Sequence, residues 1–270
     1  MNKQAALESF RAIPEKSLGK WRYRVFGAGA RTFLCVPGGE LVNDLGFEFA
    51  LAIGKTHRVI YPGYPRASTI EELSDGLRAI LDVEGIAQVA ILGASFGGAV
   101  AQVFVRRHPD RVTELILSNT GVPLQYLARP VRITCWIFKM MPWGLTSKLL
   151  RKPLLKTVDQ SSADHTFWAR YLDELCSTRL TKADVLSNML IQHDYHCRFH
   201  FAPEDLKDWH GSVLIAESDT DVIGPRRRKA LRDTYPQAEV HTFHNAGHGP
   251  MFTRYDEYLQ MVQDFLKSRE

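Results

Sequence analysis

The residues best suited to chemistry are Gly93, Ala94, Ser95, Phe96 and Gly97, which form a G-x-S-x-G pattern. They follow an apolar run that is typical of a buried strand. A serine in this pattern lies at the tip of a tight strand-to-helix turn, where its hydroxyl stands clear of the sheet. The two flanking glycines leave room where side chains would collide with the neighbouring strand and helix. Such a turn can also be purely structural or bind phosphate. Whether Ser95 is catalytic therefore depends on which other residues could act with it.

A histidine and two aspartates follow Ser95 in the chain. His248, preceded by Gly247, follows a strand predicted over residues 238–243. A histidine side chain can accept a serine proton as a general base and return it as a general acid. Asp219 and Asp221 both come just after another predicted strand.

Alternating strands and helices must position these residues. Apolar runs predict strands over residues 21–26, 32–36, 57–61, 88–92, 112–118, 212–217 and 238–243. Helices are predicted between them, within residues 44–54, 68–83, 96–107, 225–235 and 254–267. This rhythm indicates a mostly parallel sheet with helices on both faces.

The rhythm stops between residues 122 and 206, where the pattern is helical and punctuated by prolines, among them Pro130 and Pro153. A helical insertion of this size predicts a cap over the carboxyl ends of the strands, where such sheets bind ligands. We therefore expect a core in two parts, residues 1–121 and 207–270, with a cap over residues 122–206.

Composition limits the class of protein. The net charge is +4 over 270 residues, and there is no basic stripe, so we expect no nucleic-acid partner. The four cysteines lack CxxC spacing, which argues against a zinc site and a disulfide scaffold. The longest apolar segment, residues 131–141, is much shorter than the ~20 residues that a membrane span needs. We expect a cytoplasmic protein without a membrane span; the oligomeric state stays open.

Over nearly its whole length the chain resembles the α/β-hydrolase fold superfamily, in the form that carries a helical cap. The resemblance rests on the G-x-S-x-G turn, which continues into Gly98, and on residues 108–112, His-Pro-Asp-Arg-Val, at the step into the next strand. Residues 209–248 resemble most the maspardin-like branch of the superfamily.

The resemblance implies a catalytic triad of Ser95, Asp221 and His248. Asp221 is preferred over Asp219 because residues 221–225, Asp-Val-Ile-Gly-Pro, match the family register, although Ser218 stands in the usual glycine position. It also implies an oxyanion hole formed by the backbone N–H groups of Gly39 and Phe96. No cofactor and no metal are implied, since His193, His196, His200 and Asp194 do not form a zinc motif seen in the family.

These features predict a serine hydrolase that cleaves carboxylic esters through an acyl-enzyme on Ser95. Two alternatives stay open: the same triad acting on a C–C, lactone or amide bond, and a non-catalytic, maspardin-like binding or scaffold protein. The predicted cap is rich in large apolar side chains, which indicates a small-molecule substrate with an uncharged or apolar group. They are Trp136, Phe138, Met140, Met141, Trp143, Phe167, Trp168 and Tyr171.

Overall fold

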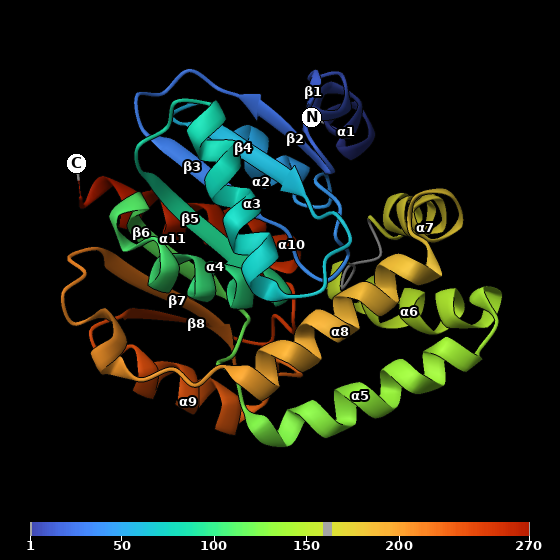
Figure 1. Ribbon diagram of the computed structural model, residues 1–270. Helices are drawn as coiled ribbons and strands as arrows, with labels where there is room; N and C mark the ends of the chain where they lie inside the picture. Colours follow the sequence, from blue (N-terminus) through green and yellow to red (C-terminus); the bar gives the residue numbers. More distant parts are fainter. Residues whose placement is uncertain (1, 159–163, 270) are drawn as a thin grey trace.

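The computed structural model describes residues 2–158 and 164–269. Over these residues the chain forms one eight-stranded sheet in the order β1-β2-β4-β3-β5-β6-β7-β8 (Figure 1). β1 and β2 pair antiparallel, as do β2 and β4, and the remaining pairs are parallel. The strands are β1 Glu15–Leu18, β2 Trp21–Phe26, β3 Thr32–Val36, β4 Arg58–Gly63, β5 Val89–Ala94, β6 Val112–Ser118, β7 Ser212–Ser218 and β8 Glu239–Phe243.

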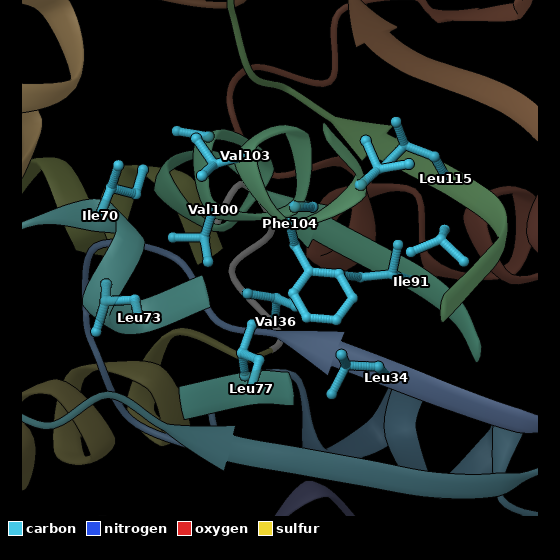
Figure 2. Close-up of a cluster of buried hydrophobic side chains, with 14 of the residues drawn as sticks. Leu34, Val36, Ile70, Leu73, Leu77, Ile91, Val100, Val103, Phe104 and Leu115 are labelled. Carbon is cyan, nitrogen blue, oxygen red and sulfur yellow. The ribbon is translucent and has the colours of Figure 1, made fainter. Parts of the chain in front are cut away.

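Helices cover both faces of this sheet, because the central strands are apolar on both sides. On one face, Leu34 of β3 packs with Leu77 and Phe104 from the helices above it (Figure 2). On the other face, the Phe33 ring packs against Phe49, a helical residue, within a second buried cluster. The α/β-hydrolase fold expected from the sequence is therefore confirmed. The helices of the two faces are α1 Lys3–Arg11, α2 Phe47–Ile53, α3 Ile70–Val83, α4 Phe96–Arg107, α9 Pro225–Thr234, α10 Pro250–Thr253 and α11 Tyr255–Lys267.

Four helices are inserted between β6 and β7 and lie together on one side of the molecule (Figure 1). α5 packs along α8, and α6 contacts α7, α8 and α10. The boundaries proposed for a separate cap, residues 122–206, stay a prediction. The inserted helices are α5 Gln125–Met140, α6 Trp143–Val158, α7 His165–Glu174 and α8 Lys182–Arg198, with a π-helical turn over Leu175–Arg179 and a 3₁₀ turn over Pro203–Leu206.

Two of the prolines taken as breaks lie inside helices, so that expectation was wrong for them. Pro130 is within α5 and Pro153 within α6. A proline removes the hydrogen bond to the carbonyl four residues earlier. Those carbonyls belong to Tyr126 and Leu149, both exposed residues, where water can replace the missing donor.

The first part of the fold also departs from expectation. α1 and β1 were not predicted, and β4 continues through Pro62 to Gly63 rather than ending at Tyr61. β3 pairs with β4 only as far as Ile60, so the missing N–H of Pro62 interrupts no ladder on that side. On its other side, Pro62 pairs with β2.

Within the described ranges, no helix is long and apolar enough to cross a membrane.

Candidate active site

Ser95 occupies the turn between β5 and α4 with a strained backbone, φ 52° and ψ −117°. The neighbouring glycines are required by space. A Cβ on Gly93 would lie 2.3 Å from the carbonyl oxygen of Gly97, and a Cβ on Gly97 would lie 2.5 Å from that of Pro37. The hydroxyl of Thr120 donates to the Ser95 carbonyl at 2.7 Å and fixes the turn from the end of the next strand. The local sequence thus forces Ser95 out of regular geometry, as expected of a nucleophile turn.

The structure brings Ser95, His248 and Asp221 together from three separate strand ends. His248 Nε2 lies 3.0 Å from Ser95 Oγ, and His248 Nδ1 lies 2.7 Å from Asp221 Oδ1. With Nδ1–H donating to the carboxylate, Nε2 is left to accept the serine O–H. Asp219 takes no part: its carboxylate accepts from the His244 ring at 2.9 Å and from the Asn245 N–H at 2.8 Å.

The environment of Asp221 keeps it ionised. Burial alone would raise its pKa, but hydrogen bonds to the carboxylate outweigh burial and hold the pKa below its ordinary value. The donors are His248, the Ile223 N–H at 3.0 Å and the Asn119 side chain at 2.7 Å. Sequence reasoning missed Asn119; its only signal was its place directly after an apolar strand.

Two adjoining cavities open beside these residues. The inner cavity, of about 200 Å³, reaches Ser95, and the outer cavity, of about 500 Å³, extends between the core and the inserted helices. Both are bordered by Gly39, Glu40, Leu154, Thr157 and His248. Gly39 thus lies at the junction of the two cavities. Phe96, the other residue expected to bind an oxyanion, begins α4 directly after Ser95, and its ring packs against Tyr64.

The wall of the inner cavity is apolar apart from a few groups. Phe49, Leu92, Leu172 and Phe252 are among its lining residues, and none of the described lysines or arginines lines it. Tyr61 also lines it and accepts a hydrogen bond from the Gly46 N–H at 3.1 Å.

Glu40, which the sequence reasoning overlooked, is an acidic side chain at this wall. Its Oε1 accepts the Gly38 N–H at 3.0 Å, and it forms no ion pair with any residue that the structure describes. Burial raises the pKa of Glu40, with backbone hydrogen bonds and the charge of His248 opposing the rise. The cavity therefore presents a carboxyl group without a cationic counterpart.

The aromatic and methionine side chains of the inserted helices divide three ways. Phe138 lines the outer cavity. Trp168 and Tyr171 are buried in packing, and Trp136 and Met140 are exposed. Only one of the expected set therefore faces the cleft.

The histidines of α8 do not converge on a common point. His196 Nδ1 accepts the Leu124 N–H at 3.2 Å, and His193 Nδ1 lies 3.1 Å from the Ala128 carbonyl. Burial, with the charge of Arg227, lowers the pKa of His196 to about 4. Among the described residues, no group of three or more His, Cys, Asp or Glu is arranged to hold a metal.

Comparison with known proteins identifies the family. The sequence profile of the alpha/beta hydrolase family matches residues 26–261, and the chain belongs to this family. It is 26% identical to a 2-hydroxy-6-oxononadienedioate/2-hydroxy-6-oxononatrienedioate hydrolase from Dechloromonas aromatica, over 97% of this chain and 96% of that protein. It is 25% identical to maspardin from Danio rerio, over 91% of this chain and 78% of maspardin.

Solved structures agree with this assignment at the level of the fold. The enol-lactonase from Burkholderia xenovorans superposes with a TM-score of 0.75 at 18% identity, over 94% of this chain and 100% of the lactonase chain. The protein is an α/β hydrolase, an enzyme of the hydrolase class.

Proposed function

We propose that this protein is a serine hydrolase that cleaves small, uncharged carboxylic esters, with Ser95 as nucleophile. The proposal rests on one observation: Ser95 Oγ, the His248 ring and the Asp221 carboxylate form a continuous chain of contacts at 3.0 and 2.7 Å. Ser95 attacks the carbonyl carbon while His248 takes its proton. His248 then protonates the leaving alcohol, and an acyl-enzyme remains on Ser95.

Water completes the reaction. His248 removes a proton from a water molecule, which attacks the acyl carbon, and the released Ser95 oxygen regains a proton from His248. Asp221 holds the imidazole in the Nδ1–H form and stabilises the positive charge that develops on it. The lowered pKa of Asp221 supports this role, because an ionised carboxylate is required throughout.

Gly39 and Phe96 complete the site in this proposal. The backbone N–H of Phe96 is at the start of α4, where the helix dipole favours negative charge. Gly39 borders both cavities, in the loop that follows β3. Their N–H groups would bind the oxyanion of the tetrahedral intermediate, and a backbone N–H can do this whatever the side chain of its residue.

The lining of the inner cavity favours an uncharged acyl group. The Dechloromonas aromatica relative is named for a dienedioate, a substrate with two carboxylates. A carboxylate in a buried pocket needs a cation or several hydrogen-bond donors. Over the residues that the structure describes, the inner cavity is lined by no lysine or arginine, and it already contains the Glu40 carboxyl.

A lactone is the second candidate substrate. The shared fold with an enol-lactonase favours it, and a lactone carries the same neutral carbonyl that the inner cavity can accept. The same triad would open the ring without any change in the roles of the residues.

Covalent labelling tests the proposal most directly. The purified protein is treated with a fluorophosphonate probe, and the labelled peptide is identified by mass spectrometry. Labelling is expected on Ser95 and should be absent from Ser95→Ala, with Ser9→Ala, an exposed serine of α1, as the matched control. Folded wild type that neither reacts with the probe nor hydrolyses neutral esters or lactones would exclude the proposal and favour a binding role.

A further inference from the structure

The outward face of α5 is apolar although it is exposed. Its side chains are 43–69% accessible, which is unusual for large apolar residues on a solvent-facing helix. The spacing of these residues places them on one side of the helix, whereas the buried Ala128 and Cys135 lie on the side packed against α8. The exposed stripe consists of Tyr126, Ile133, Trp136, Ile137 and Met140.

α6, the next helix along the chain, also has exposed apolar residues, mixed with cations. Leu145 and Leu149 are about half exposed. Lys148, Lys152 and Lys156 are exposed at positions three, seven and eleven residues after Leu145, so they share its side of the helix. α6 thus presents two leucines among three lysines. The exposed residues of α5 and α6 are called the α5–α6 face below.

The charge of this part of the chain is of one sign. Residues 115–158 contain seven lysines and arginines and no aspartate or glutamate. The rest of the chain has 27 Lys and Arg against 30 Asp and Glu, so the positive net charge comes from this segment. Arg151 pairs with Asp173. The other six cations have no ion pair with a described residue: Arg129, Arg132, Lys139, Lys148, Lys152 and Lys156.

An anionic lipid surface fits both properties at once. Large apolar side chains enter the boundary between headgroups and acyl chains, while lysine stems lie along it and keep their charges among the headgroups. A symmetric contact with a second copy would place the same cations opposite one another, which opposes association. A nucleic acid would neutralise the cations but leave the aliphatic stripe uncovered.

We propose that the α5–α6 face binds peripherally to anionic lipid bilayers. This proposal does not depend on the reaction at Ser95. The same helices border the cleft, since Phe138 of α5 and Leu150 and Lys156 of α6 line the outer cavity. Docking would therefore bring the outer cavity close to the lipid surface.

Vesicle sedimentation with the full chain tests this. The expected result is co-sedimentation with phosphatidylcholine vesicles in which about a third of the lipid is phosphatidylserine, and little binding to pure phosphatidylcholine. Raising the salt from about 0.1 M to about 0.5 M should release the protein, because screening weakens the headgroup attraction. Trp136→Glu, and Lys148→Glu combined with Lys152→Glu, should each reduce the partition coefficient at least about tenfold.

Matched controls lie on other faces of the molecule. Val83→Glu replaces an equally exposed apolar residue of α3, and Lys229→Glu reverses an exposed charge of α9. Both should bind as wild type does. Every variant is checked by its thermal unfolding midpoint and by fluorophosphonate labelling, so that lost binding is separated from lost folding.

Three results would overturn the proposal. The first is wild type that does not bind anionic vesicles at low salt. The second is binding that Trp136→Glu and the double lysine variant leave unchanged. The third is a stable dimer in light scattering that Trp136→Glu dissociates, which would assign the α5–α6 face to a second copy of the chain.

Discussion

Asn119 donates a side-chain hydrogen bond to Asp221 Oδ2 at 2.7 Å, on the carboxylate oxygen that does not face His248. Asn119 directly follows β6 and has a positive φ of 45°, and its backbone N–H bonds to the Ala216 carbonyl of β7. The orientation of Asp221 is therefore set from a neighbouring strand. This makes Asn119 a positioning residue for the proposed triad.

Replacing Asn119 tests that role. Asn119→Ala removes a bond to a charged acceptor, and we expect kcat for a neutral p-nitrophenyl ester to fall about tenfold to a hundredfold. KM should change little, because the side chain is not among the residues that line the inner or outer cavity. Asn119→Asp should lower kcat further than Asn119→Ala does, since it places a second carboxylate beside Asp221. A kcat equal to that of wild type would show that Asn119 does not position Asp221.

The two aspartates after β7 give opposite predictions. Asp221→Asn should lower kcat by about four orders of magnitude, because an amide cannot hold the imidazole in the correct tautomer with its charge balanced. Asp219→Asn should stay within a few-fold of wild type, since Asp219 bonds only to the exposed His244 and its turn. Ester turnover of both variants distinguishes them, and the reverse order would exchange their roles.

Asp44 is expected to secure the inserted helices to the core. Its buried carboxylate accepts from Arg11 of α1 at 2.9 Å, from Arg179 at 2.9 Å and from Tyr171 of α7 at 2.6 Å. Asp44→Asn should lower the free energy of unfolding by about 1.5–3 kcal/mol, because it removes the buried charge that accepts hydrogen bonds from Arg11 and Arg179, although Glu174 still pairs with both. Urea unfolding measures this. Asp75→Asn, which breaks an exposed pair with Arg107, is the control and should cost less than about 1 kcal/mol.

The contribution of Asp44 also depends on pH. Burial would raise its pKa, but hydrogen bonds and charge from Arg179, with the Tyr171 and Arg11 contacts, hold the pKa below its ordinary value. A lowered folded-state pKa means that the stabilisation is fully present above the unfolded-state pKa of about 3.9. It is lost as pH falls through the lower, folded-state value. The difference in free energy of unfolding between wild type and Asp44→Asn should therefore narrow below about pH 4. A difference that persists below that pH would contradict this prediction.

Glu40 should discriminate against anionic substrates. Wild type should hydrolyse a neutral butyrate ester faster than a succinate monoester, whose free carboxylate would meet Glu40. Glu40→Gln should raise kcat/KM for the succinate monoester about tenfold and change that for the neutral ester only a few-fold, in steady-state kinetics. Burial raises the pKa of Glu40, so the discrimination of the wild type should weaken as the pH is lowered towards that pKa. If wild type and Glu40→Gln show the same preference for the neutral ester over the succinate monoester, Glu40 does not contribute to substrate selectivity.

Predictions from the sequence were most accurate where local pattern decides structure. β3, β6 and α4 begin and end where the apolar runs and glycines indicated. β1 was missed because it is largely exposed and gives no apolar alternation. Pro130 was taken as a break because proline opposes helix locally, whereas packing of α5 along α8 sustains the helix.

The sequence by itself determined the fold family and the order of Ser95, Asp221 and His248 along the chain. These depend on short-range rules: a serine needs flanking glycines to occupy this turn, and parallel strands end at one edge of the sheet. Only the tertiary structure decided that Asp221, not Asp219, contacts His248, and that Asn119 and Glu40 lie beside them. Asn119 and Asp221, for example, are about 100 residues apart in the chain. Which such side chains meet is determined by the packing of the whole chain, and no local sequence pattern encodes that packing.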